Sequence, residues 1–266
     1  MIGQIGFVIL NYNTFEFLKG LVEELLTKQN RKIVVIDNFS NPEERSRVIQ
    51  FCKAKEIICL PRDNDGYGAG NNAGLLAAVD AFKCDYYVVM NPDMMLGAED
   101  FSELVHLTGA FVAGPKIITN QNKNQNPYWV FKSRLAEWLI YTGVKREVPL
   151  ITFAGIGWHK IIKVIANGVI SHRKVQRTFA LHGACLIFSA PALRALGIAV
   201  FDEKIFLYTE EEDLAYKCQA KGIPQYYMPT MSIRHFEDGS PIEVGKTNRF
   251  TRESILYRYK KWHSRS

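Results

Sequence analysis

The sequence predicts an α/β fold with a mostly parallel central sheet flanked by helices. Short apolar runs alternate with longer segments in which apolar residues recur at a helical period, and short polar links join them. The apolar runs show no polar alternation, as expected for strands that helices cover on both faces. With 266 residues, 47% of them hydrophobic, the chain can bury the core of one large domain or of two small ones.

The first half of the chain contains the most regular elements. The predicted strands are residues 4–10, 32–36, 56–60 and 86–90, and the predicted helices are residues 17–25, 43–55 and 71–82. Pro92 cannot continue a strand ladder, so the fourth strand must end before it. Later elements are a helix at 99–107, strands at 110–115 and 181–188, an acidic helix at 210–221 and an extended segment at 226–235. A polar loop at 120–127 and a loop at 236–240 lie between them.

Each of the first four strands is followed by Asn or Asp side chains. They are Asn11, Asp37, Asp63 with Asn64, and Asn91 with Asp93. Because the carboxyl ends of parallel strands meet at one edge of a sheet, these side chains are expected to converge on one ligand. Ordinary turn chemistry is the alternative for any one of them.

A glycine-rich link follows the third strand. It contains Gly68-x-Gly70-x-x-Ala73, a formal match to the dinucleotide-binding fingerprint. That fingerprint follows the first strand of its unit, whereas two strand–helix units precede it here. An NAD(P)-dependent oxidoreductase is therefore the weaker alternative. The predicted helix start at Asn71 offers free N–H groups to an anion.

Four consecutive acids, Glu210 to Asp213, open the acidic helix. Thr209 and Glu212 have the spacing of a capping box, and acids in a first turn complement the helix dipole. Successive helical residues diverge by about 100°, so at most one or two of the four carboxylates can face a cleft.

Taken in order, these motifs resemble bacterial family 2 glycosyltransferases of the GT-A fold, and among them the rhamnosyltransferase-like branch. The motifs are VILNYNT (8–14), VVIDNFS (34–40), NDGYGAGNNAGL (64–75), VVMNPDM (88–94), HGACLIFS (182–189), FDEKIFLYTEEEDLAYK (201–217) and His235. The resemblance implies one GT-A domain over residues 1–240, with a nucleotide-sugar-binding half (1–115) and an acceptor-binding, catalytic half (116–240). Residues 241–266 form a basic tail with an expected helical structure.

The resemblance also implies roles for individual residues. The nucleotide-sugar donor would be bound by Leu10, Asn11, Asp37, Asn64, Gly66 and Asn91. Asp37 matches the acid that recognises the base, and Asn64 with Gly66 matches the loop over the nucleoside.

The metal and the base follow from the same resemblance. Asn91-Pro92-Asp93 takes the place of the D-x-D motif, so its first acid is absent and Asp93 is the remaining carboxylate. Asp93, with His235, would hold Mn2+ or Mg2+ against the diphosphate leaving group. Glu211 matches the catalytic base, which takes the proton of the acceptor hydroxyl in an inverting displacement, and Glu210 is the reserve. Glu212 and Asp213 are assigned to capping and the helix dipole.

Charge is unevenly distributed. The net charge is +6, yet residues 121–180 hold ten Lys and Arg against two acids, and residues 246–266 hold seven against one. The rest of the chain is acidic, which argues against a nucleic-acid-binding protein. Both basic segments would suit an anionic membrane surface, where a polyprenyl-diphosphate-linked saccharide or another glycan could be the acceptor. Residues 160–165 suggest an amphipathic helix, for which a core helix with a basic face is an equal alternative.

Composition bounds the cellular setting. Five scattered cysteines without a C-x-x-C pair indicate neither a disulfide framework nor a zinc site, which fits a reducing compartment. No uncharged apolar run reaches the ~18 residues of a membrane helix, and no signal-peptide pattern precedes the first strand. We expect a cytoplasmic protein, soluble or peripheral at the inner face of the plasma membrane. An inactive homologue that only binds a sugar nucleotide is the remaining alternative.

Overall fold

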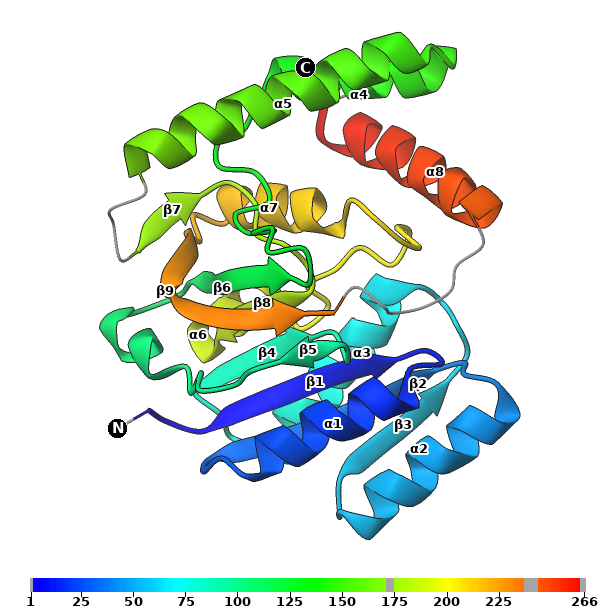
Figure 1. Ribbon diagram of the computed structural model, residues 1–266, viewed down its shortest axis with the longest axis vertical. Coiled ribbons are helices and arrows are strands. Elements are labelled where there is room, and N and C mark those ends of the chain that lie inside the picture. The colour runs from blue at the N-terminus through cyan, green and yellow to red at the C-terminus, as the bar shows by residue number, and fades with distance from the viewer. Residues whose placement is uncertain (1, 171–174, 237–243, 264–266) are drawn as a thin grey trace.

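The computed structural model describes residues 2–170, 175–236 and 244–263, and its strands form a mixed, mostly parallel sheet (Figure 1). The strands are β1 (Ile5–Asn11), β2 (Arg31–Asn38), β3 (Ile58–Arg62), β4 (Tyr86–Met90), β5 (Met94–Met95), β6 (Val112–Thr119), β7 (Gln176–Thr178), β8 (Cys185–Ser189) and β9 (Gln225–His235). Their order is β3-β2-β1-β4-β8-β6-β9-β5, and β7 pairs with β9. The α/β prediction is confirmed.

Helices cover both faces of the sheet. They are α1 (Phe15–Leu26), α2 (Pro42–Ala54), α3 (Tyr67–Ala81), the 3-10 helix η1 (Ser102–His106), α4 (Arg134–Arg146), α5 (Pro149–Ile170), α6 (Ala190–Leu196), α7 (Glu210–Ala220) and α8 (Val244–His263). One core lies between the sheet and α1 and α2, and a second lies between the sheet and α3, α6 and α7. Adjacent residues of β1 serve different cores, since Phe7 belongs to the first and Val8 to the second.

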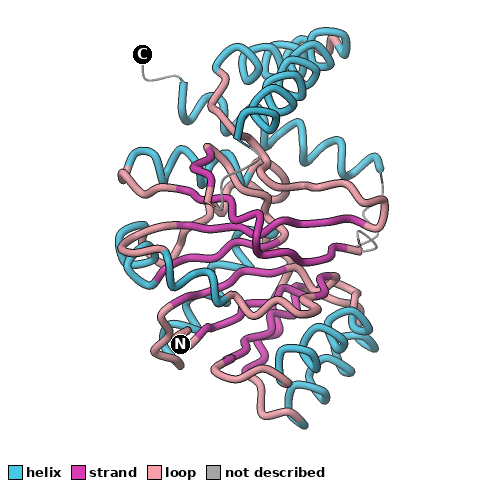
Figure 2. Tube along the Cα trace, turned by 60° about the vertical axis from the view of Figure 1, so that its left-hand side comes forward, coloured by secondary structure: helices cyan, strands magenta, loops and turns pink. Residues whose placement is uncertain are grey.

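Strands β3, β2, β1 and β4 form one parallel part of the sheet, and β6 also pairs in parallel with β9. β8 then runs antiparallel to both β4 and β6, so the doubly wound pattern stops at β4. In Figures 1 and 2, α4 and α5 lie together at the end of the molecule opposite α1 and α2. Helices α4 and α5 thus form one end of the molecule, away from the parallel strands β1 to β4.

Most predicted elements are confirmed within a few residues, and β4 has the predicted bounds. Three predictions need correction. The helix predicted at 99–107 is the short η1, the strand predicted at 110–115 extends to Thr119, and the helix after the glycine-rich link begins at Tyr67 instead of Asn71. The loop at 237–240 and the boundary at residue 240 lie outside the described residues.

Two glycines of α3 are explained by close packing. A Cβ atom on Gly70 would lie 2.3 Å from Cδ1 of Leu10, and one on Gly74 would lie 2.3 Å from Cγ1 of Val8. These glycines therefore let α3 approach β1 closely, and they do not form a phosphate-binding loop before a helix. The N–H groups at the start of α3 follow Gly66, whose φ of +103° suits only glycine.

Candidate functional site

The Asx side chains after the parallel strands do converge. Nδ2 of Asn11, at the end of β1, donates to Oδ1 of Asp37 at 3.2 Å. Nδ2 of Asn38 donates to Oδ1 of Asn64 at 3.0 Å, and the same oxygen accepts from the Gly66 N–H at 3.2 Å. The ends of β1, β2 and β3 are thus joined by side-chain hydrogen bonds, as the strand-end pattern predicts.

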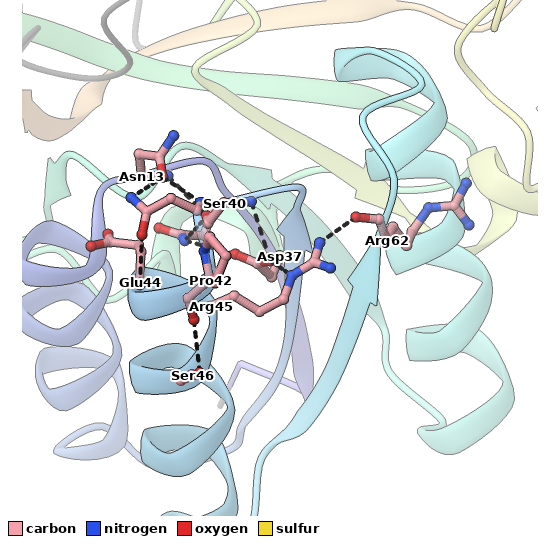
Figure 3. A network of polar contacts seen from close by, with 10 residues as sticks. Asn13, Asp37, Ser40, Pro42, Glu44, Arg45, Ser46 and Arg62 are labelled. Carbon is pink, nitrogen blue, oxygen red and sulfur yellow. Dashed lines mark hydrogen bonds and ion pairs between the residues drawn. The ribbon is translucent and has the colours of Figure 1, made fainter.

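Asp37 is enclosed within this edge of the sheet (Figure 3). Its Oδ2 accepts from Nε of Arg45 at 2.7 Å and from the Ser40 N–H at 3.4 Å, while Nη2 of Arg45 donates to the Arg62 carbonyl at 2.5 Å. The Asp37 carboxylate has no exposed surface, so it fixes Asn11 and Arg45 in place. Arg45 was not predicted as a site residue, because the sequence of a surface helix does not show which of its basic side chains contacts the end of a strand.

Tyr67 connects the glycine-rich link to the end of β4. Its hydroxyl lies 3.0 Å from the Gly183 carbonyl oxygen and 3.3 Å from Oδ1 of Asn91. The Gly183 N–H in turn donates to Oε1 of Glu211 at 3.1 Å. Asn91 and Glu211 therefore belong to one continuous site, although 120 residues separate them. Tyr67 and Gly183 are additional site residues, and only their place within the quoted motifs hinted at them.

The four acids of α7 have different surroundings, and Glu211 alone among them is partly exposed. Glu210, Glu212 and Asp213 are buried. Burial raises the pKa of Glu211 to about 7, and the nearby Glu212 carboxylate adds to the shift. Glu211 can therefore exchange a proton near neutral pH at the surface of the site.

Glu210 is the poorer candidate for a base. Burial raises its pKa well above the ordinary value, and the Glu211 carboxylate adds to the shift. Among the described residues its Oε1 has no hydrogen-bond partner. A buried carboxyl group without a partner for this oxygen is poorly placed to take up a proton from a substrate hydroxyl.

The predicted capping box of Thr209 and Glu212 is wrong, although all four acids do lie in the first turn of α7, where they complement the helix dipole. Thr209 precedes α7 in a left-handed conformation, with φ of +70°, and its side chain makes no capping hydrogen bond. Glu212 instead faces Arg258, with 3.9 Å between Oε1 and Nη2, and Asp213 Oδ1 accepts from Nζ of Lys261 at 2.6 Å. The last two acids therefore bind the C-terminal helix α8 to α7.

The basic tail is helical, as expected, but some of its basic side chains form ion pairs within the protein. Besides Glu212, the Arg258 guanidinium contacts Oε2 of Glu137 at 3.6 Å, and its side chain is 2% exposed. Oδ1 of Asp213 also accepts from Nε1 of Trp262 at 2.7 Å. These basic residues cannot reach a membrane while α8 stays packed against α4 and α7.

Asp93 and His235 are brought together from the ends of β4 and β9. Nε2 of His235 lies 3.2 Å from Oδ1 of Asp93, and Nδ1 of His235 lies 2.8 Å from Oε1 of Gln125. Both side chains are nearly buried. A carboxylate and an imidazole that meet in this way suit Mn2+, which accepts oxygen and nitrogen ligands.

Asp93 and His235 together offer two candidate ligands. In the described part of the chain, no group of three or more His, Cys, Asp or Glu side chains could hold a metal ion. A metal at Asp93 and His235 therefore depends on ligands from a bound diphosphate and from water. Oδ1 of Asn91 accepts from the Tyr67 hydroxyl. This contact is consistent with the donor-binding role that the resemblance implies for Asn91, and not with a role as a metal ligand.

The membrane and cysteine predictions have different outcomes. The five cysteines are all free thiols, as expected. In contrast, one helix in the described residues, α5, is long and apolar enough by length and composition to cross a membrane, through its segment Pro149–Ala166. Our count of uncharged runs missed it because Lys160 and Lys163 interrupt the segment.

Solved structures share the fold at low sequence identity. GalNAc-T7 with UDP, GalNAc and Mn2+ is 14% identical over 99% of this chain, with a TM-score of 0.63, and the chain covers 49% of its length. The mannosyltransferase PcManGT of Pyrobaculum calidifontis with GDP-Man and Mn2+ is 11% identical over 94% of this chain and 61% of its own, with a TM-score of 0.56. S. aureus TarS 1-349 with UDP-GlcNAc is 11% identical over 90% of this chain and 60% of its own, with a TM-score of 0.52. The fold is therefore that of GT-A glycosyltransferases.

Sequence comparisons agree with this fold. The low-salt glycan biosynthesis hexosyltransferase Agl10 of Haloferax volcanii is 25% identical over 269 residues, which cover 97% of this chain and 78% of the relative. The family model described as Glycosyl transferase family 2 matches residues 7–157, more than half of the chain. The protein is a glycosyltransferase and belongs to glycosyl transferase family 2.

Proposed function

We propose that this enzyme transfers a sugar from a nucleotide-diphosphate donor to a hydroxyl group with inversion at the anomeric carbon. The observation that carries the proposal is the hydrogen-bonded path from Asn91 through Tyr67 and Gly183 to Glu211, since it places a proton acceptor beside the predicted donor site. The donor is dTDP-rhamnose or a UDP-sugar. Support for a nucleotide sugar comes from the structural neighbours with UDP, GDP-Man and UDP-GlcNAc.

In this mechanism Asp93 and His235 would hold the metal beside the diphosphate of the donor. The ion supplies charge neutralisation of the leaving group. Asn11, Asn64 and Gly66 form the edge against which the nucleoside lies. Asp37 acts by holding Asn11 and Arg45, because its carboxylate is already enclosed.

Glu211 takes the proton from the attacking hydroxyl. It is the accessible acid of α7, and the hydrogen bond from the Gly183 N–H leaves its second oxygen to face the acceptor. With the hydroxyl attacking from the side opposite the diphosphate, one displacement inverts the anomeric centre. The acceptor in this proposal is a glycan or a polyprenyl-diphosphate-linked saccharide, in the synthesis of a cell-surface polysaccharide. The name of Agl10, a glycan-biosynthesis hexosyltransferase, supports this setting.

A donor screen tests the proposal. Purified protein with Mn2+ is incubated with dTDP-rhamnose, UDP-hexoses, UDP-galactofuranose and GDP-sugars, and release of the nucleoside diphosphate is measured. We expect one donor to be hydrolysed or transferred faster than the others and EDTA to suppress the reaction. Donor binding without turnover, even with glycan acceptors, would identify a sugar-nucleotide-binding homologue and contradict the proposal.

Replacing the metal-binding carboxylate should weaken donor binding. Asp93→Ala leaves His235 as the one remaining protein ligand, so we expect Mn2+ to improve donor affinity in the native protein but not in the variant. The expected loss is at least about tenfold, because changing only the residues that support a metal ligand already costs about tenfold to a hundredfold. Calorimetric titration of the donor with and without Mn2+ measures the effect. An Mn2+ dependence that survives in Asp93→Ala would show that the metal binds elsewhere.

The pH dependence of the reaction should reflect Glu211. A general base works in its deprotonated form, so activity should fall as the pH drops below about 7, the raised pKa of this carboxyl group, and level off above it. The measurement is kcat/KM against pH for the best donor, with Mn2+ saturating at each pH. A profile that stays flat from pH 5.5 to pH 8 would contradict the assignment (these limits lie about 1.5 below and 1 above that pKa).

A further inference from the structure

Helix α5 exposes a continuous stripe of large apolar side chains. It consists of Leu150, Phe153, Trp158, Ile161, Val164 and Ile165, which are between 43% and 79% exposed. At about 100° per residue, these six positions fall within an arc of about 140°, which is one side of the helix. Scattered apolar residues at a protein surface are ordinary, but a stripe along about four helical turns requires an explanation.

Two polar residues of α5, His159 and Lys163, point the other way, toward the protein. The ring of His159 stacks on Trp129, with 3.9 Å between ring centroids. Nζ of Lys163 donates to the Gln125 carbonyl at 3.2 Å. The usual amphipathic arrangement of a surface helix, apolar inward and polar outward, is thus reversed. This arrangement is unfavourable in water, so the outer face of α5 is built for a different environment.

A core position and a membrane span both conflict with the contacts. Only 11% of the segment Pro149–Ala166 is buried, so α5 is not a core helix. It is also held against its neighbour α4, since a Cβ on Gly155 would lie 2.8 Å from Cγ1 of Ile140, and one on Gly143 would lie 2.3 Å from Oγ1 of Thr152. With one side fixed on α4 and Gln125, the helix can present only its other side to lipid.

The charge around α5 indicates which lipid surface suits it. Residues 134–166 contain five Lys and Arg against two acids, and one of these acids, Glu137, is buried. Arg134, Lys145, Arg146 and Lys160 are exposed. An apolar stripe with surrounding basic side chains is the pattern of helices that lie in the interface of an anionic bilayer.

We propose that α5 lies flat on an anionic bilayer, with its apolar stripe among the lipids and the basic residues of α4 and α5 at the headgroups. Figures 1 and 2 show α4 and α5 together at one end of the molecule, where a planar surface can reach them. The segment also touches the active site, because Gln125 accepts from Lys163 and contacts His235. Membrane binding by α5 is a property separate from the proposed sugar transfer. Because vesicle binding is measured without a donor, membrane binding and sugar transfer can each fail without the other.

Vesicle flotation tests the proposal. The full chain is mixed with phosphatidylcholine vesicles with or without phosphatidylglycerol, and bound protein is quantified at low and high salt. Phe153→Glu combined with Val164→Glu should reduce binding by at least about tenfold, because both side chains leave the lipid and bring negative charge. The matched control is Ile49→Glu with Leu76→Glu, which changes the same charge at 40% and 48% exposed apolar positions on α2 and α3 and should bind as the native protein does.

A second variant examines the charge contribution. Replacing Lys145, Arg146 and Lys160 by Gln should remove the preference for phosphatidylglycerol while leaving residual binding to both vesicle types. Far-ultraviolet circular dichroism confirms that each variant keeps its helical content. Native protein that fails to float with anionic vesicles would overturn the proposal. So would a dimer in light scattering that Phe153→Glu with Val164→Glu dissociates, since α5 would then cover a second copy of the chain.

Discussion

Glu211→Gln is expected to abolish turnover while leaving donor binding intact. The amide keeps the shape of the side chain and can still accept from the Gly183 N–H, but it cannot take a proton. General-base catalysis contributes about 10² to 10⁴-fold, so kcat should fall by that factor while the dissociation constant of the donor changes by less than about twofold. Steady-state kinetics and calorimetric titration of the donor with Mn2+ measure the two quantities separately.

Glu210→Gln is the matched control for that substitution. Burial raises the pKa of Glu210 well above its ordinary value, which favours the neutral carboxyl group, and an amide is close to that neutral form in shape and charge. We therefore expect Glu210→Gln to retain most of the native activity. Normal transfer by Glu211→Gln, or an equal loss in both variants, would refute Glu211 as the base.

Arg258→Ala is expected to destabilise the protein by about 3 to 5 kcal/mol, the cost of removing one partner of a buried ion pair. The side chain is 2% exposed and lies between the carboxylates of Glu137 and Glu212. Its removal leaves two acids buried without their cation. Tyr216 and His263 also contact Oε2 of Glu137, so the substitution affects the junction of α4, α7 and α8 as a unit. Urea denaturation followed by circular dichroism measures the change in unfolding free energy.

The control on the same helix is Arg249→Ala. Nε of Arg249 pairs with Oε1 of Glu253 at 2.9 Å, but the two side chains are 77% and 57% exposed. Exposed pairs of this kind contribute about 0 to 1 kcal/mol. If Arg258→Ala costs no more than Arg249→Ala, the buried cluster does not hold α8 to the domain, and the last two acids of α7 need another explanation.

Local patterns were sufficient to predict the donor edge of the sheet. The apolar run ending at Met90 and the Asn and Asp residues after β1, β2 and β3 required only strand periodicity and turn chemistry. The contact between Asp93 and His235 followed from the family resemblance and is present in the structure. The strand ends are encoded within short segments, whereas the contact of Asp93 with His235 joins distant segments and was expected only from the resemblance.

Other features depend on contacts between distant segments. Glu212 and Asp213 were read as capping residues because the partners Arg258 and Lys261 lie more than 40 residues away and carry no local signal. Gly68 and Gly70 were read as part of a loop, whereas both lie in α3, where Gly68 packs on Phe201 and Gly70 packs on Leu10 of β1. The outward apolar face of α5 was equally invisible, because periodicity shows that a helix has two faces and not which of them is buried.

The central claim is that Asp93 with His235 holds the diphosphate while Glu211 activates the hydroxyl on the opposite side of the sugar. The most direct measurement is the anomeric configuration of the first-formed glycosyl product, determined by NMR with the donor that the screen identifies. A single displacement predicts a product whose configuration is inverted relative to the donor. A product that retains the configuration of the donor would contradict the account.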